Sequence, residues 1–313
     1  MNLQSIFAAK RRIQAHIRAT PLELSHALSR ETNSPIYLKL ENWQITGSFK
    51  IRGAFNKLLS LSEKEKHKGI ITASAGNHAL GVAHAAGILG IHGKIVLPQD
   101  ASPAKVQALQ NYDLELVQEG QDYDQAEQIA YELQRKEGLT FVHAFSDPDI
   151  IAAQGTVGLE IVAEQPEVRS IVVPIGGGGL VAGVAIAAKS INPKIKIIGV
   201  QSEASPAMYN AVKAGKVVET PIAETVADGL AGRFVTELTL KLANDFVDDI
   251  VLVSEQAIKE ALRLILANEH IWLEGSAAVG VAALLENRIR PTGRTALVLT
   301  GRNAGLKQME GLI

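Results

Sequence analysis

Short apolar runs alternate with segments of helical periodicity along most of the chain. Nine runs are compact and rich in Ile, Leu and Val, as buried parallel strands are, and they predict strands at residues 36–40, 70–73, 94–97, 114–117, 140–143, 171–175, 196–200, 250–253 and 296–299. Segments between them predict helices at residues 77–89, 103–110, 123–136, 180–190, 255–269 and 276–286. This alternation predicts an α/β fold, in which helices cover both faces of an open, twisted parallel sheet.

The N-terminal segment has a different pattern. Leu3, Ile6, Ile13 and Ile17 fall on one face at helical spacing, which predicts an amphipathic helix. No apolar run reaches the roughly 18 residues that a membrane-spanning helix needs. The basic residues at 10–12 are not followed by the apolar core of a secretory signal. We therefore expect a cytoplasmic protein without a membrane segment, and a mitochondrial transit peptide is the alternative for the N-terminal helix.

Composition narrows the class of protein. With 313 residues, 47% of them hydrophobic and 20% charged, the chain fits one large or two modest globular domains. A net charge of −2 gives no reason to expect nucleic acid or an anionic membrane as a partner. The chain has no cysteine, which excludes disulfides, thiolate metal sites and a cysteine nucleophile.

The first candidate for chemistry is Lys50, in the string TGSFKIRGAF at residues 46–55, which follows KLENWQ at 39–44. Lys50 stands at a predicted helix start, between the apolar Phe49 and Ile51. A desolvated lysine loses basicity and becomes a nucleophilic amine, suited to a Schiff base with an aldehyde cofactor. A surface lysine on an amphipathic helix is the alternative.

The second candidate is the glycine run PIGGGGLVAG at residues 174–183, between a predicted strand and a predicted helix. Four glycines let backbone N–H groups converge at a helix N-terminus, which predicts a phosphate-binding cradle. A flexible turn is the alternative. The run lacks the spacing of a dinucleotide fingerprint and the Lys-Ser/Thr of a nucleotide P-loop.

The third candidate is the turn SAGNH at residues 74–78, which also joins a strand to a helix. Backbone N–H groups at such a helix start can hold a carboxylate. Asn77 is alternatively a plain helix cap, and we interpret His78 as a structural support of the turn rather than a general base.

These three motifs, in this order, resemble the fold type II pyridoxal phosphate enzymes, in their threonine/serine dehydratase and serine racemase branch. The resemblance covers residues 20–303. It implies two open, twisted α/β domains with the cofactor between them: a large one from residues 1–51 and 146–313, and a smaller inserted one from residues 52–145.

The resemblance also implies roles for individual residues. Lys50 would hold pyridoxal 5'-phosphate covalently and take the substrate's α-proton, and Asn77 would bond the ring hydroxyl. The implied cofactor-binding set is Phe49, Lys50, Asn77, Gly176, Gly177, Gly178, Gly179, Leu180 and Thr300, and the implied substrate-binding set is Ser74, Ala75, Gly76 and Asn77. Glu274 and the loop at 227–229 also match cofactor-lining segments, although a helix-start acid and a turn are their alternatives.

Ala75 is the main departure from the pattern. In the racemase branch a serine at this position transfers a proton on the face opposite the lysine, and alanine cannot do so. We therefore expect β-elimination: L-threonine would give 2-oxobutanoate and ammonia, and L-serine would give pyruvate. A serine or aspartate-type racemase remains the alternative within the fold, and a catalytically silent pyridoxal phosphate-binding protein is the alternative of another class. A cysteine-synthase-like enzyme would have aspartate where Ile51 stands.

Near the C-terminus, Thr300 matches the residue that bonds the pyridine nitrogen, or is a simple strand-end residue. Arg302 stands where the family has a small residue, which suggests a diacid substrate such as 3-hydroxyaspartate, or only a solvent-facing side chain. The chain ends about ten residues beyond this motif, so we expect no regulatory domain.

The acidic residues that bind a divalent cation in the racemase branch correspond to Gln201 and Ala207, so we expect no Mg²⁺ site there. A monovalent cation held by carbonyl groups remains an option. The family leads us to expect a homodimer or homotetramer.

Overall fold

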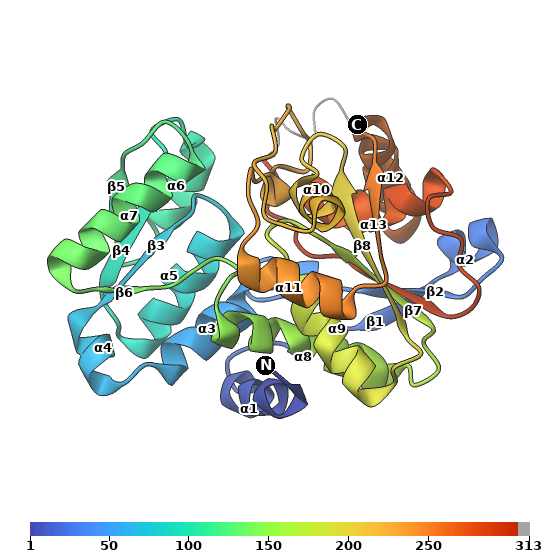
Figure 1. Cartoon of the computed structure of the whole chain (residues 1–313), viewed down its shortest axis with the longest axis horizontal. Coiled ribbons are helices and arrows are strands. Elements are labelled where there is room, and N and C mark those ends of the chain that lie inside the picture. Colours follow the sequence, from blue (N-terminus) through green and yellow to red (C-terminus); the bar gives the residue numbers. More distant parts are fainter. Residues whose placement is uncertain (306–313) are drawn as a thin grey trace.

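The computed structural model describes residues 1–305. Two sheets organise it: six strands in the order β1-β2-β10-β7-β8-β9, and four strands in the order β5-β4-β3-β6 (Figure 1). The strands of the first sheet are β1 (Leu22–Ser25), β2 (Ile36–Lys39), β7 (Ser170–Pro174), β8 (Lys196–Ser202), β9 (Asp249–Val253) and β10 (Thr295–Val298). Those of the second are β3 (Ile70–Ala73), β4 (Gly93–Leu97), β5 (Glu115–Gln118) and β6 (Thr140–Phe141).

Each sheet with its helices forms one half of the molecule. The helices of the six-stranded half are α1 (Leu3–Ile13), α2 (His26–Thr32), α8 (Pro148–Glu164), α9 (Gly179–Ile191), α10 (Ala207–Ala214), α11 (Glu237–Phe246), α12 (Glu255–Glu269) and α13 (Gly275–Leu285), with short 3-10 turns η1 (Glu41–Trp43) and η2 (Asp228–Leu230). Those of the four-stranded half are α3 (Lys50–Ser60), α4 (Glu63–Lys68), α5 (Asn77–Leu89), α6 (Pro103–Leu109) and α7 (Tyr123–Glu137).

Alternate side chains of the six-stranded sheet reach opposite cores. On β10, Leu297 packs in the core that includes α12 and α13, whereas Ala296 and Val298 pack in the core that includes α8 and α9. The four-stranded sheet is likewise covered by α7 on one face and by α3 and α5 on the other. The α/β fold with two layered sheets is thus confirmed.

All nine predicted strands and all six predicted helices are present, with ends shifted by two residues at most, and α1 forms at the predicted N-terminal helix. β1 is not among the predicted strands. This strand pairs antiparallel with β2 at the sheet edge, while the other pairs are parallel. Only Ser25 of its four residues is buried, so it lacks the apolar run of a central strand.

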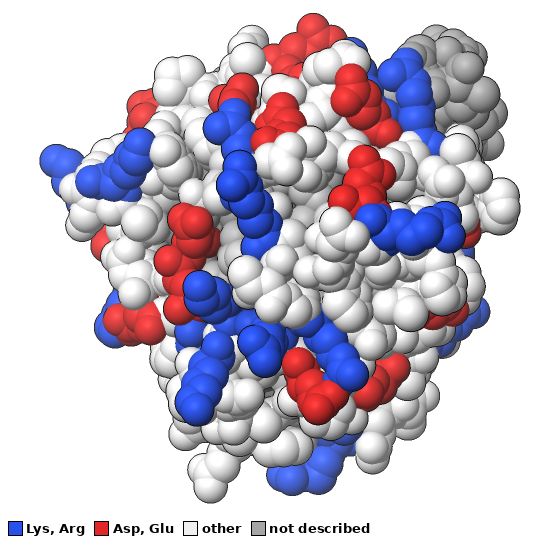
Figure 2. All heavy atoms as spheres, turned by 90° about the vertical axis from the view of Figure 1, so that its right-hand side faces the viewer, with Lys and Arg blue, Asp and Glu red and all other residues white. Residues whose placement is uncertain are grey.

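Ion pairs join the two halves beside the loop that carries η2. Lys105 of α6 lies 2.9 Å from Asp228, and Arg233 pairs with Asp122, also at 2.9 Å, and with Asp124 at the start of α7. The face in Figure 2, the right-hand side of Figure 1, carries acidic and basic side chains interspersed. That face therefore has no broad patch of one sign. None of the helices within residues 1–305 is long and apolar enough to cross a membrane.

Candidate active site

Lys50 is the first residue of α3, after a turn in which Gly47 adopts φ +76°. Its Nζ donates a hydrogen bond of 2.8 Å to the carbonyl oxygen of Ala144 and lies 5.4 Å from the ring centre of Phe49. Burial lowers the pKa of Lys50 to about 8, against the opposing effect of the Glu274 carboxylate. A sizeable fraction of this amine is therefore neutral and nucleophilic near physiological pH.

A buried set of charges, which we call the Arg52 network, holds the first turn of α3. Arg52 is fully buried and bonds the carboxylates of Glu41, at 2.7 and 2.8 Å, and Glu160, at 2.6 and 2.8 Å. Lys39 lies 2.8 Å from the same Glu160. Burial alone would lower the pKa of Arg52, but the two carboxylates raise it above its usual value. The network thus ties the residue two positions after Lys50 to η1 and α8.

The glycine run forms the start of α9. Gly178 is the N-cap in a left-handed conformation, φ +95°, and no side chain caps the helix. A Cβ atom on Gly177 or Gly179 would lie about 2.4–2.5 Å from atoms of Phe145, and one on Gly176 would lie 3.3 Å from Leu230. The loop is a cradle that side chains would fill, at the positive end of a helix. Leu180 and Phe49 contribute to the apolar cluster beneath it.

The Ser74–His78 turn opens α5, where Gly76 is the N-cap and no side chain caps the helix. Ser74 Oγ accepts the backbone N–H of Gly76 at 3.1 Å. Asn77 is not the cap that one alternative proposed. Its Nδ2 donates to Glu274 Oε1 at 2.7 Å, and its Oδ1 accepts from Asn303 Nδ2 at 2.6 Å.

Two neighbours of Asn77 differ in surroundings. Ala75 is half-buried at the edge of the core of the four-stranded half. His78 is buried, and its Nε2 lies 3.0 Å from the carbonyl oxygen of Val142. Burial, with the nearby Lys50 cation, lowers the pKa of His78 to about 3. His78 is therefore a neutral, fixed side chain, as expected of a structural support.

The end of β10 brings these segments together. Phe49 N–H donates to the carbonyl oxygen of Thr300 at 3.1 Å, and Ser48 pairs with Gly301 in an antiparallel bridge. Glu274 N–H donates to Gly301 at 3.2 Å. The residue that matches the pyridine contact thus lies against the segment that carries Lys50.

Glu274 is buried at the N-cap of α13. Burial, and then the nearby Asp228 carboxylate, raise the pKa of Glu274 to about 7. Near neutral pH its carboxyl group is therefore protonated in part of the molecules and can donate a hydrogen bond there. Sequence comparison indicated this residue, but its raised pKa follows only from the tertiary arrangement.

These residues fit a phosphorylated aldehyde cofactor. They include a nucleophilic lysine, a glycine cradle at a helix start, and polar groups with unused hydrogen-bonding capacity. The buried Oγ atoms of Ser48 and Ser276 have no hydrogen-bond partner in the described part of the chain. A bound polar ring can satisfy such groups.

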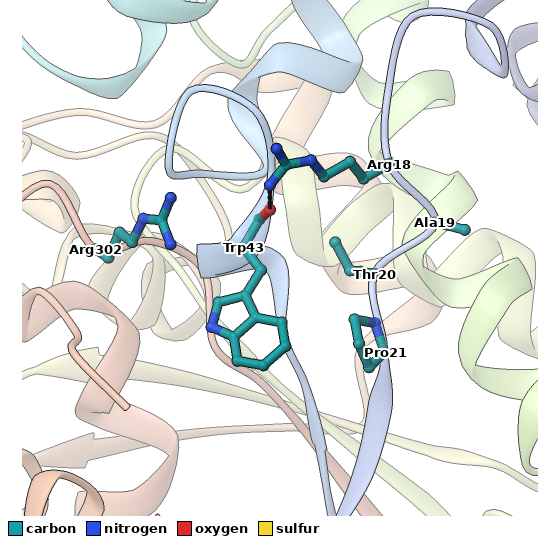
Figure 3. Close-up of a pocket in the computed structure, with 6 residues that line it drawn as sticks. All are labelled: Arg18, Ala19, Thr20, Pro21, Trp43 and Arg302. Carbon is teal, nitrogen blue, oxygen red and sulfur yellow. Dashed lines mark hydrogen bonds between the residues drawn. The ribbon is translucent and has the colours of Figure 1, made fainter. Parts of the chain in front are cut away.

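The backbone N–H of Arg302 donates to the carbonyl oxygen of Gly47 at 2.9 Å, but its side chain lines a different surface. With Arg18 and Trp43 it lines a surface pocket of about 170 Å³, whose other lining residues are Ala19, Thr20 and Pro21 (Figure 3). Arg18 Nη1 donates to the carbonyl oxygen of Trp43 at 3.0 Å. None of the predicted cofactor or substrate residues lines this pocket, so the diacid hypothesis gains no support from Arg302.

At the positions of the divalent cation site, Gln201 bonds the backbone of Ser205 and Tyr209 at 3.3 and 2.9 Å. Ala207 is the first residue of α10. Within residues 1–305, no three His, Asp or Glu side chains gather closely enough to hold a metal ion.

A buried lysine with a lowered pKa and a glycine loop at a helix start, between two α/β halves, are the arrangement expected of an enzyme of the fold type II class. The chain belongs to the family of pyridoxal-phosphate dependent enzymes, whose family model matches residues 13–301. Its cofactor is accordingly pyridoxal phosphate.

Individual relatives agree with this family. An L-threonine ammonia-lyase of Thermotoga maritima is 43% identical over 100% of this chain and 78% of its own length. The structure of maize serine racemase matches with a TM-score of 0.94 at 33% identity, over 98% of this chain and 95% of the racemase. That of processed threonine deaminase isoform 2 from Solanum lycopersicum matches with a TM-score of 0.93 at 35% identity, over 99% and 86% of the two chains. The backbone fold therefore does not distinguish elimination from racemisation.

Proposed function

We propose that the chain is an L-threonine ammonia-lyase, which converts L-threonine to 2-oxobutanoate and ammonia and L-serine, as a secondary substrate, to pyruvate. The observation that carries the choice is Ala75, because this side chain cannot transfer a proton and racemisation needs a proton-transfer group on each face of the substrate. The 43% identity to an L-threonine ammonia-lyase supports the same activity.

Pyridoxal phosphate, when bound, withdraws electrons from the amino acid and makes its α-proton acidic. Lys50 Nζ would hold the cofactor covalently and, as a free amine, would accept the α-proton of the bound amino acid. The lowered pKa of Lys50 supports both roles, because each needs the neutral amine.

The other residues bind and orient. The backbone of residues 176–179 holds the phosphate, with Phe49 and Leu180 as apolar neighbours. Asn77 and Thr300 bond the ring, and backbone N–H groups of residues 74–77 bind the substrate carboxylate. The bonds of Asn77 to Glu274 and Asn303 support its role, because they fix the amide before a ligand arrives.

The division into domains follows the two sheets. We assign residues 1–51 and 146–313 to a large cofactor-binding domain and residues 52–145 to a smaller inserted domain, in a cytoplasmic homodimer or homotetramer. The strands β3 to β6 within residues 70–141 support this division.

The test is the release of 2-oxo acid by the purified protein loaded with pyridoxal phosphate. L-Threonine, L-serine, D-serine and 3-hydroxyaspartate are supplied in parallel, and chiral chromatography of L- and D-serine measures racemisation. We expect the fastest release from L-threonine and a slower one from L-serine.

Three results would overturn the proposal. Rapid racemisation without 2-oxo acid would make the protein a racemase. Faster release from 3-hydroxyaspartate would reassign the substrate. No turnover of any compound, with the cofactor visibly bound, would make it a silent binding protein.

A further inference from the structure

Residues 143–146 join the two halves and contact both functional elements. They follow β6 and lead to Asp147, the N-cap of α8 (Figure 1). The carbonyl oxygen of Ala144 accepts the Lys50 amine at 2.8 Å. The next residue, Phe145, packs directly against the glycine cradle. One short segment thus touches the covalent attachment point and the phosphate-binding loop.

The glycines of the cradle are required for different reasons. Gly178 alone among the four has positive φ, at +95°, and a Cβ there would lie 2.5 Å from the flexible end of Met208. A Cβ on Gly177 would lie 2.4 Å from the Phe145 ring, and one on Gly179 would lie 2.5 Å from the Phe145 carbonyl oxygen. Backbone conformation therefore explains glycine at 178, whereas close approach of Phe145 explains glycine at 177 and 179.

Phe145 is itself held in place. The edge of its ring meets the ring of His143, with centres 4.6 Å apart. His143 Nδ1 accepts the backbone N–H groups of Phe145 and Ser146 at 3.1 and 2.9 Å. Burial and the Lys50 cation lower the pKa of His143 to about 4, so this acceptor stays neutral.

Contacts on both sides extend this support. The His143 and Phe141 rings make an edge contact with centres 6.1 Å apart, and Phe141 stacks on Tyr131 of α7 with ring centres 4.2 Å apart. Ser146 Oγ lies 2.7 Å from Thr236 Oγ1 in the loop before α11. Phe145 is thus anchored to the four-stranded half through α7 and to the six-stranded half through Thr236.

We propose that Phe145 is a positioning residue that fixes the glycine cradle relative to the Lys50 amine. A cofactor attached at one end and held by its phosphate at the other requires a set separation between these two points. The ring of Phe145 sets the position of the cradle at Gly177, and the preceding carbonyl group sets that of Lys50 Nζ. This inference rests on the proposed cofactor site and not on the identity of the substrate.

The test is a double-mutant cycle in the apoprotein, read as the dissociation constant of added pyridoxal phosphate. Gly177→Ala in the natural background places a methyl group against the Phe145 ring, and we expect affinity to fall at least tenfold. In the Phe145→Ala background that clash is gone, and we expect the same substitution to change affinity less than threefold.

Gly178→Ala is the matched control. Alanine at 178 is strained by the positive φ and does not meet Phe145. It should therefore lower the affinity for pyridoxal phosphate by the same factor in both backgrounds. A second readout is the pH midpoint of the bound cofactor's absorbance change, which reports on the nitrogen of Lys50. Phe145→Ala should move this midpoint by at least about half a pH unit, which is about a threefold change in the protonation equilibrium of the Lys50 nitrogen. Phe7→Ala, which removes an exposed ring of α1 that takes no part in these contacts, should leave the midpoint in place.

Equal loss from Gly177→Ala in both backgrounds would overturn the inference, as would an unchanged midpoint in Phe145→Ala. If Gly177→Ala fails to fold, recovery of folding in the double variant supports the inference. If the double variant also fails to fold, the pH midpoint of Phe145→Ala decides the question. Because these readouts need no substrate, a protein that shows the coupling but releases no 2-oxo acid would refute only the proposed activity.

Discussion

The starts of α3 and α9 both contribute to the candidate site, but the fold fixes them by different means. At α3, the Arg52 network joins two cations and two carboxylates in a buried position. At α9, Phe145 and Met208 lie so close to the loop that a Cβ atom on Gly177, Gly178 or Gly179 would meet them. A buried ion-pair network loses stability when one of its charged members is removed. A close-packed loop loses stability when a methyl group is added. The two regions should therefore respond to opposite kinds of substitution.

Lys50→Ala should give the largest effect, because it removes the reactive group and leaves both supporting regions intact. We expect turnover of L-threonine to fall by about 10³-fold or more, with an unchanged circular dichroism spectrum. The measurement is 2-oxo acid release, with the exposed Lys64→Ala as control. Full activity in Lys50→Ala would refute the assignment of this residue.

Glu160→Ala tests the charged region. It leaves Arg52 and Lys39 buried with one carboxylate fewer, so we expect a loss of about 3–5 kcal/mol in the free energy of unfolding, measured by urea denaturation. The control is Asp245→Asn, which breaks the exposed Lys241–Asp245 pair of α11 and should cost less than about 0.5 kcal/mol. Equal costs for both variants would contradict a structural role for the Arg52 network.

Glu274 is a buried carboxylate outside the Arg52 network, and its raised pKa can be tested through the pH dependence of stability. Its folded pKa of about 7 lies above the ordinary 4.5, so between these values the unfolded chain releases a proton that the folded protein keeps. Stability should therefore fall as pH rises through this window, by about 2–3 kcal/mol between pH 5 and pH 8. Glu274→Gln in the apoprotein should remove this component from the pH dependence. Identical pH profiles for both proteins would show that Glu274 has an ordinary pKa.

Gly178→Ala tests the packed region for stability. A left-handed alanine costs about 1–2 kcal/mol, and the Met208 side chain can move aside. We therefore expect a smaller loss of unfolding free energy than for Glu160→Ala, together with weaker cofactor binding. A stability loss as large as that of Glu160→Ala would remove the contrast between the two regions.

Ala75→Ser should give the smallest change in stability, within about 0.5 kcal/mol, because the residue is half-buried and makes no special contact. Its informative effect is chemical: a hydroxyl group near the substrate should raise racemase side activity, measured by chiral chromatography of serine. If no D-serine forms, position 75 does not face the reacting carbon.

The pattern of apolar residues explains which helices and strands could be predicted from the sequence. Strands with apolar runs were recognisable, but β1, with its sequence LELS, was not, because one buried residue gives no periodic signal. α8 is also absent from the predicted helices, because its buried residues surround the helix instead of marking one face. Asp147 as N-cap and Pro148 in the first turn were the available signals.

At the site, local motifs indicated Lys50, the glycine run and the Ser74–His78 turn. The Arg52 network and Phe145 were missed as functional residues, because Arg52 and Glu160 are 108 positions apart and the contact of Phe145 with Gly177 depends on packing between the halves. Arg52 meets Glu160 from α8, and Phe145 meets Gly177. Spacing along the chain records neither contact.

The strand order also constrains how the protein is made. β10, the last strand within residues 1–305, lies between β2 and β7, and Thr295 pairs with Ile36, which the ribosome adds about 260 residues earlier. The four strands from β3 to β6 are complete by residue 141 and can fold during synthesis. The six-stranded sheet must keep a gap at its centre until Thr295–Val298 have been added. During that interval the facing edges of β2 and β7 are unpaired, and they are the surfaces that a chaperone would protect.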